Sequence, residues 1–202
     1  MRQTRPIVLL LLIVSSSLVF LRQAPTANAR DISGDMDGFY PRSDSPYHVK
    51  GNLTIQPDAT ATIERGSVIY FDGNYSLTVK GKLVAIGTSV DQITFAWKDG
   101  GTQRNNWKGI ILQSTTRPST ISYCTISNAR AALTIEGSLY NVITNNIIRY
   151  NNAAILIQAA QGNIISDNEI YENTECGVSV RNGCQRILIS SCLLYTSDAA
   201  DE

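Results

Sequence analysis

The 202-residue chain has a single histidine and no excess of either charge. His48 lies beside Tyr47 in a polar, turn-rich stretch, where a surface or packing role is favoured over catalysis. The 17 Lys and Arg residues balance the 17 Asp and Glu residues, and no basic run occurs. Balanced charge without a basic stripe argues against nucleic acid as the main partner.

Cysteine is also scarce, with four residues in the whole chain. So few cysteines exclude a disulfide scaffold of the kind that small secreted domains use. Cys176 and Cys184 flank a predicted strand, and an extended link of this length would hold them roughly 26 Å apart. We therefore expect Cys124, Cys176 and Cys184 to be buried thiols. A Cys176–Cys184 bridge that closes a corner of the fold is the alternative.

The only apolar run of any length lies near the start of the chain, from Ile7 to Leu21. It follows two arginines, contains three serines and is short of the ~20 residues that span a membrane. The small residues Ala27 and Ala29 form a cleavage pattern, so residues 1–29 are predicted to be a secretory signal. The mature chain would then begin at Arg30, outside the cytoplasm and without a membrane span. An uncleaved anchor is the alternative.

A repeat of 22 to 24 residues organises the chain from Gly109 to Ser191. Each unit contains three short runs of β-branched residues separated by Asn, Gly and Ser. Like residues return in columns, and three of these columns are predicted to be structural ladders: Ile121, Ile143 and Ile165; Cys124, Asn146 and Asn168; and Asn128, Asn151 and Asn173.

Three strands in about 22 residues predict one turn of a parallel β-helix, in which each strand stacks on its equivalent one turn later. Stacked asparagines at the corners can hydrogen-bond to each other and to the turn backbone. The Leu-x-x-Leu-x-Leu frame of leucine-rich repeats is absent. We therefore predict an all-β solenoid of about six turns over residues 51–191. Residues 30–50 are predicted to be a lead-in or cap.

Several motifs are similar to the entry turns of secreted right-handed parallel β-helix repeat proteins of the pectate-lyase-like superfold. The residues that carry this resemblance are Ser45–Tyr47, Gly51–Ile55, Val79–Thr88, Ile93–Phe95 and Asn106–Ile110. The resemblance covers residues 45–191 and implies a right-handed β-helix. It does not imply one activity, since this fold hosts lyases, hydrolases, epimerases, adhesins and periplasmic accessory proteins.

Residues 192–202 resemble the translation of a transposase adaptor used in sequencing libraries. Leu193 and Leu194 could extend the last strand, whereas Asp198 to Glu202 break the repeat. This resemblance predicts that the segment is not native and that the natural chain continues beyond Ser191. A genuine polar tail is the alternative.

Few residues suggest catalysis. If the strands alternate as predicted, Glu136 and Arg181 share an outward column two turns apart, roughly 10 Å from each other. They are the candidates for a lyase or hydrolase, which needs a base and acidic groups or a pair of carboxylates. Asp167, Glu169 and Glu172 cluster in one turn but offer too few oxygens for Ca²⁺. No metal or cofactor is predicted.

The polar segment between Ala96 and Lys108 is the one sizeable insertion before the regular turns. Trp97 lies in it and is the candidate for stacking on a sugar ring. Trp107 is expected to be a packing anchor instead. We therefore predict a secreted or periplasmic, non-enzymatic β-helix module, a scaffold, adhesin or carbohydrate-binding protein, with a polysaccharide or cell-surface glycan as partner. A fragment of a polysaccharide lyase or hydrolase is the alternative.

Overall fold

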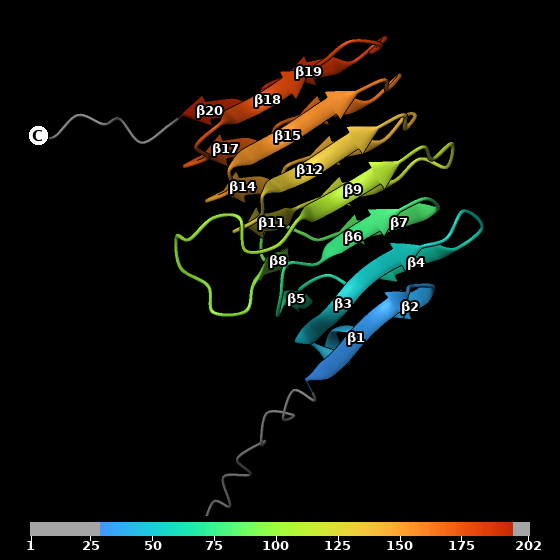
Figure 1. Cartoon of the computed structure of the whole chain (residues 1–202), viewed down its shortest axis with the longest axis vertical. Helices are drawn as coiled ribbons and strands as arrows, with labels where there is room; N and C mark the ends of the chain where they lie inside the picture. The colour runs from blue at the N-terminus through green and yellow to red at the C-terminus, as the bar shows by residue number, and fades with distance from the viewer. Residues whose placement is uncertain (1–28, 196–202) are drawn as a thin grey trace, which may run out of the picture.

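The computed structural model describes residues 29–195 and shows a parallel β-helix (Figure 1). The predicted secretory signal falls, except for Ala29, on residues outside the described ones, and so do residues 196–202 of the predicted non-native tail. The chain runs from β1 at one end of the coil to β20 at the other. The predicted fold class is confirmed.

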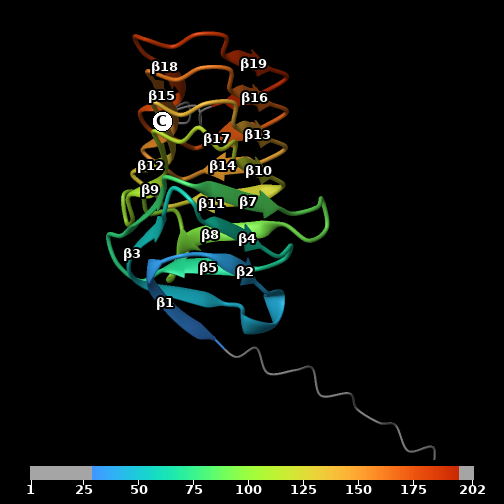
Figure 2. The same ribbon diagram turned by 90° about the vertical axis from the view of Figure 1, so that its right-hand side faces the viewer.

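The coil has three faces, each a stack of parallel strands. The first face is formed by β3 (Tyr47–Ile55), β6 (Ser76–Val79), β9 (Gly109–Gln113), β12 (Ala131–Glu136), β15 (Ala153–Gln158) and β18 (Cys176–Val180). The second is formed by β2 (Gly38–Tyr40), β4 (Thr60–Ile63), β7 (Lys82–Ile86), β10 (Thr120–Ser122), β13 (Val142–Thr144), β16 (Ile164–Ser166) and β19 (Leu188–Ser190) (Figure 2). The third is formed by β5 (Val68–Phe71), β8 (Ile93–Trp97), β11 (Cys124–Ser127), β14 (Ile147–Arg149), β17 (Glu169–Tyr171) and β20 (Leu193–Tyr195).

The coil has about seven turns, one more than the sequence predicts. The additional turn comes from the segment before residue 51. There, β1 (Arg30–Asp35) pairs with β3, β2 pairs with β4, and a short 3-10 helix (Arg42–Asp44) follows. The long strand β3 bends from the third face to the first, pairing with β5 through its first half and with β6 through its second.

The core consists of apolar columns that the chain register produces. Ile121, Ile143 and Ile165 pair in sequence across β10, β13 and β16, and all three are fully buried. Because side chains alternate along a strand, every second residue points inward, and a 22-residue period returns the same residue type to the same inner position. Burial of these columns is the main stabilising term of the fold.

Asparagine ladders stabilise three corners of the coil, because a buried amide can hydrogen-bond to the turn backbone and a β-branched apolar residue cannot. Asn146 N–H and Nδ2 both donate to Asn168 Oδ1, at 3.0 and 2.9 Å, and Asn146 Oδ1 accepts from Cys124 N–H at 2.9 Å. Each amide therefore satisfies the backbone of one turn and the side chain of the next. A further ladder, Asn141 on Asn163, repeats the same bonds at 2.9 and 2.8 Å and was missed in the sequence, although its spacing is also 22.

Asn128 does not belong to the third predicted ladder. Ala129 N–H, and not Asn128, donates to Asn151 Oδ1 at 2.8 Å, and Asn151 stacks in turn on Asn173. The interval from Asn128 to Asn151 is 23 residues, whereas the hydrogen-bonded asparagine rungs Asn141–Asn163, Asn146–Asn168 and Asn151–Asn173 each span 22 residues. Asn128 has a left-handed φ of 66°, and its side chain points to the insertion instead.

The cysteines of the described chain are free thiols, so the alternative Cys176–Cys184 bridge is not formed. Cys124 occupies a ladder position, and its full burial raises the pKa of its thiol. Cys176 and Cys184 are only partly buried, in the last turn.

Candidate functional site

Glu136 and Arg181 lie in one outward column of the first face, with Gln158 between them. Gln158 Nε2 donates to Glu136 Oε1 at 2.9 Å, which engages the carboxylate. Arg181 follows β18, where its N–H donates to the Ile157 carbonyl at 2.8 Å. No ion pair joins Glu136 to Arg181 within the described residues, and the column contains no second carboxylate beside Glu136. The arrangement lacks the carboxylate pair that a glycoside hydrolase requires.

The acidic cluster of the sixth turn is also spread apart. Glu169 accepts a hydrogen bond from Tyr195 Oη at 3.2 Å, and Glu172 pairs with Arg104 at 3.6 Å. Asp167 lies at a corner with a left-handed φ of 57°. Over the described range, no three His, Cys, Asp or Glu side chains converge to hold a metal ion.

The same range contains no helix with the length and apolarity needed to cross a membrane.

A hollow of about 490 Å³ lies on the third face, between Tyr70 below and Arg149 above. The register explains it, because the outward column runs Tyr70, Ala96, Ser127, Arg149 over four successive strands. Two small side chains between two large ones leave a gap of about 14 Å, three strand spacings of ~4.8 Å. Threonine hydroxyls of the neighbouring outward column, Thr94 and Thr125, also line it. We call this hollow the third-face groove.

The insertion between β8 and β9 forms the side wall of the third-face groove, and it projects from the coil in Figure 1. Trp97, Lys98, Asp99, Gly100 and Gly101 line the groove. The glycines have φ values of 61° and 79°, which let the chain reverse there without the strain that a side chain would add. The candidate sugar-stacking residue Trp97 therefore lies at this hollow.

The other tryptophan is part of the core. Trp107 is fully buried, its ring stacks on Phe71 with centroids 3.9 Å apart, and its Nε1 donates to the Ser127 carbonyl at 2.8 Å. It anchors the end of the insertion to the coil. Tyr140, half-exposed, lies at a different corner and does not join Trp97.

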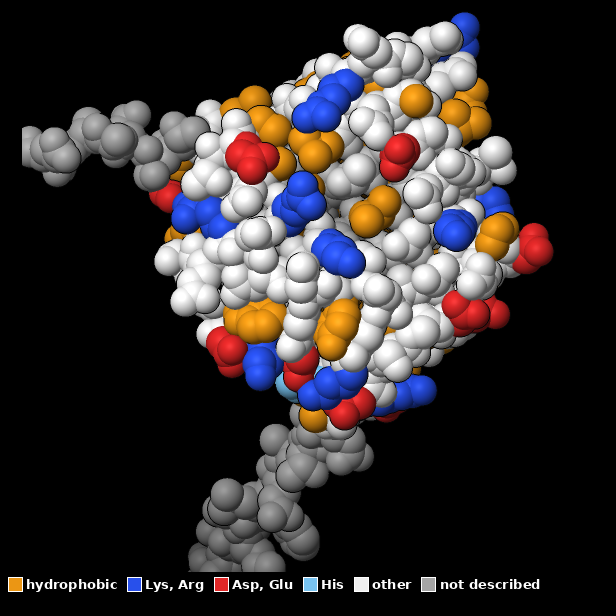
Figure 3. Space-filling model, in the orientation of Figure 1, with side chains coloured by type: hydrophobic (Ala, Val, Ile, Leu, Met, Phe, Trp, Pro, Cys, Tyr) orange, Lys and Arg blue, Asp and Glu red, His pale blue; other side chains and the backbone are white. Residues whose placement is uncertain are grey.

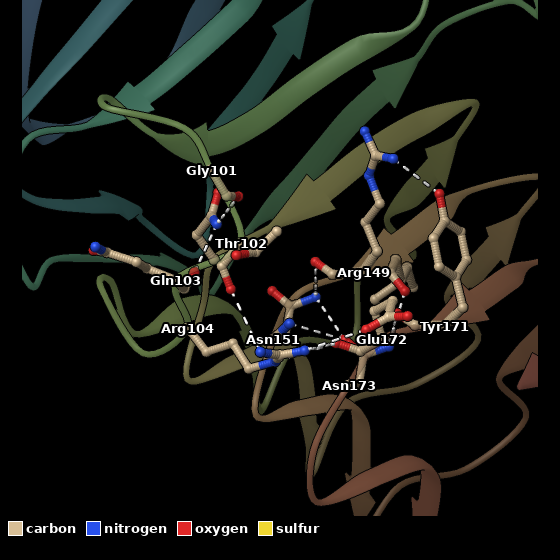
Figure 4. A network of polar contacts seen from close by, with 11 residues as sticks. Gly101, Thr102, Gln103, Arg104, Arg149, Asn151, Tyr171, Glu172 and Asn173 are labelled. Carbon is tan, nitrogen blue, oxygen red and sulfur yellow. Dashed lines mark hydrogen bonds and ion pairs between the residues drawn. The ribbon is translucent and has the colours of Figure 1, made fainter. Parts of the chain in front are cut away.

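Two side chains, one from the coil and one from the insertion, hold the loop in place, and Figure 4 shows the second of them, Arg104, beside Glu172. Asn128 Nδ2 donates to the carbonyls of Gly101 and Gln103, at 2.9 and 2.7 Å. Arg104 reaches across to the Glu172 carbonyl, with Nη2 and Nε at 2.9 and 3.2 Å. Because these bonds tie the loop to the corners that follow β11 and β17, the wall of the groove is held in one position.

Aromatic rings and a guanidinium form the upper end of the groove. Arg149 lies over the rings of Tyr150 and Tyr171, with its guanidinium carbon 5.4 and 5.8 Å from their centroids. Arg149 Nη1 also donates to Tyr171 Oη at 2.9 Å, as Figure 4 shows. Arg149 and Tyr150 could not be singled out from the sequence, because outward residues obey no burial pattern. Their only signal was a position on the same face as the insertion.

The lone histidine lies further down the same outward column, next to Tyr70. His48 Nδ1 lies 2.9 Å from Asp72 Oδ1, and Lys50 Nζ donates to Asp72 Oδ2 at 2.6 Å. Burial alone would raise the pKa of Asp72, but the hydrogen bonds from Lys50 and His48 outweigh it and lower that pKa. The carboxylate is thus fixed by two partners and serves the structure of the second turn.

The face seen in Figure 3 has no patch of one charge sign, since basic and acidic side chains are interspersed on it. This agrees with the formal net charge of zero. The third-face groove is therefore the candidate site: it combines a hollow, aromatic walls, hydroxyl groups and a wall held by hydrogen bonds.

Comparison with known proteins identifies the family. No curated protein and no solved structure matches the chain. One family model, described as "Periplasmic copper-binding protein (NosD)", matches residues 22–192, which include nearly all of the coil. This family is periplasmic and forms right-handed parallel β-helices, which confirms the predicted fold resemblance and the predicted location outside the cytoplasm. The chain therefore belongs to the NosD family of periplasmic copper-binding proteins.

Proposed function

We propose that this chain is a non-enzymatic periplasmic module that binds a glycan in the third-face groove. The observation that carries the proposal is the groove itself, with Trp97 and Tyr150 among its walls and hydroxyl-bearing residues on its floor. Sugar rings present apolar C–H faces and a rim of hydroxyl groups. Aromatic faces suit the former and short polar side chains suit the latter.

The family description names copper, and the described residues do not fit a resident copper site. Copper is held by thiolate, thioether or imidazole ligands. The only histidine is paired with Asp72, Met36 is buried in the core, and the fully buried Cys124 has a thiol whose pKa is raised by burial. Cys176, Cys184 and Cys192 are partly buried free thiols. Within residues 29–195 no three His, Cys, Asp or Glu side chains form a group that could hold a metal ion. The proposal therefore assigns the chain no role that passes through bound copper.

The lyase or hydrolase alternative has less support from the geometry. Glu136 is engaged by Gln158, and Arg181 lies apart from it, so the predicted pair does not form one reacting site. The third-face groove contains one carboxylate, Asp99. Retaining and inverting hydrolases use two carboxyl groups, about 5 to 10 Å apart.

Calorimetric titration of the purified chain with a panel of neutral and acidic oligosaccharides tests the proposal. Trp97→Ala should reduce affinity about fivefold or more, since an aromatic contact is worth roughly 1 kcal/mol or more. Tyr140→Ala removes a half-exposed aromatic ring outside the groove and is the matched control. Binding that survives Trp97→Ala, or no binding by any oligosaccharide, contradicts the proposal. New sugar chain ends in the same mixtures would favour the enzymatic alternative.

A further inference from the structure

Arg149 differs from most of the arginines of the described coil that make side-chain contacts. Arg30, Arg42 and Arg104 each lie within 4.0 Å of a carboxylate, whereas no described carboxylate lies within that distance of Arg149. Its guanidinium makes one hydrogen bond within the described residues, to the hydroxyl of Tyr171. A guanidinium has five N–H donors, so most of its hydrogen-bonding capacity is available to a ligand.

The surroundings hold this guanidinium in place without neutralising it. The rings of Tyr150 and Tyr171 lie against it, and the Tyr171 hydroxyl fixes Nη1. Aromatic faces attract a cation but leave its charge in place, and they reduce the side-chain entropy that binding would otherwise cost. Arg149 is thus positioned in advance at the upper end of the third-face groove.

The other charged groups of the groove give it a net positive lining. Lys98 projects from the insertion and makes no ion pair within the described residues, and Asp99 is the only acid among the lining residues. With Arg149 and Lys98 against Asp99, a ligand with a negative group is favoured over a neutral one. The planar guanidinium matches the two oxygens of a carboxylate, sulfate or phosphate group.

We propose that the third-face groove selects glycans that carry an oxyanion, and that Arg149 binds this group with two parallel hydrogen bonds. This inference rests on the proposed glycan-binding function and specifies its ligand. The alternative, in which Arg149 only packs on Tyr150 and Tyr171, makes a different prediction, because a packing role would give no preference between charged and neutral sugars.

The test compares a uronic-acid hexasaccharide with its carboxyl-reduced, neutral counterpart, each titrated into the full chain. We expect the acidic form to bind about tenfold or more tightly, as charge-assisted hydrogen bonds allow. Arg149→Met should abolish this preference. Arg149→Lys should retain part of it, since the positive charge remains but the planar group that donates two parallel hydrogen bonds does not. Arg130→Met removes an exposed cation outside the groove and is the control, expected to behave as the parent. Melting curves of each variant check that it is folded.

Each contrary outcome points to a different error. Equal binding of both hexasaccharides refutes the oxyanion inference and leaves the proposed function standing, whereas no binding of either refutes both. A preference that persists in Arg149→Met shows that Arg149 is a packing residue. Titration with sulfate alone and with phosphate alone tests whether the anion must be carried by a glycan. If either ion binds as tightly as the acidic hexasaccharide, the ligand of Arg149 is a free anion and the oxyanion-glycan inference is wrong.

Discussion

The ladder of Asn151 and Asn173 should contribute several kcal/mol to stability, and Asn151→Ala tests this directly. Asn151 is fully buried. Its Oδ1 accepts from Ala129 N–H at 2.8 Å, and its Nδ2 lies 2.9 to 3.2 Å from the Arg149 and Ile126 carbonyls and from Asn173 Oδ1. Alanine would leave the Ala129 N–H unpaired in the interior and would remove the side-chain donor from the three acceptors, of which Asn173 Oδ1 keeps the backbone N–H of residue 151.

The magnitude follows from those unpaired groups. A buried donor without a partner costs about 1 to 3 kcal/mol, and a carbonyl that keeps another partner costs less. Together with the small cavity, the loss should be about 2 to 4 kcal/mol. For a chain of this size, each kcal/mol corresponds to roughly 2 to 4 °C, so the melting temperature should fall by roughly 4 to 16 °C.

The adjacent asparagine provides the matched control. Asn152 lies in the same turn, is partly exposed, and its side chain makes no hydrogen bond within the described residues. Asn152→Ala should therefore change the melting temperature by no more than the few tenths of a kcal/mol typical of surface sites. Thermal unfolding followed by circular dichroism measures both variants. Equal melting temperatures would show that water replaces the amide and that the ladder is not a stabilising element.

Three further outcomes are expected. Asn128→Asp, which loses the two donors to the insertion, should speed hydrogen exchange of residues 98–107 with little effect on the melting of the coil, and unchanged exchange there would contradict the fastening role. Because the pKa of Asp72 is lowered in the folded state, its ionised carboxylate stabilises the fold above the ordinary carboxyl pKa, and this stabilisation is lost as pH falls through the lowered value. Asp72→Asn should therefore be destabilising at pH 7. In acid unfolding curves, the difference between the variant and the parent should shrink below about pH 4. Dialysis against copper under reducing and oxidising conditions should leave less than one copper per chain, and stoichiometric retention would overturn our assessment of the ligands.

The inner half of this fold was predictable from the sequence because burial restricts it. Ile121, Ile143 and Ile165 must return every 22 residues, since a shift of one position would turn each of them outward. The Asn146–Asn168 corner follows the same rule, because a buried backbone needs a partner at each rung. The one error in register, Asn128 for Ala129, arose where a true rung is held by alanine, which leaves no polar residue to mark it.

The outward-facing residues that form the groove could not be predicted in the same way. Ala96 and Ser127 are ordinary residues in the sequence, and the hollow they create exists only because Tyr70 and Arg149 stand at either end of their column. No periodicity selects these residues, since water accepts almost any outward side chain. The candidate Trp97 was recognised because an insertion interrupts the repeat, whereas Arg149 lies within a regular turn and carries no such signal.

The groove lies beside the insertion because a solenoid tolerates additional residues at its corners but not within its stacked strands. Each turn contacts only its neighbours, so an insertion at one corner is tolerated if its ends rejoin the ladder. Here Trp107 rejoins it at the core, and Asn128 and Arg104 attach the loop to the turns that follow. The insertion is thereby attached to the coil at three residues, and a held wall beside two small side chains forms a hollow that exists before any ligand arrives. Preformed shape reduces the ordering that binding requires. For this reason the break in the repeat, and not its regular turns, is where we place the function of this protein.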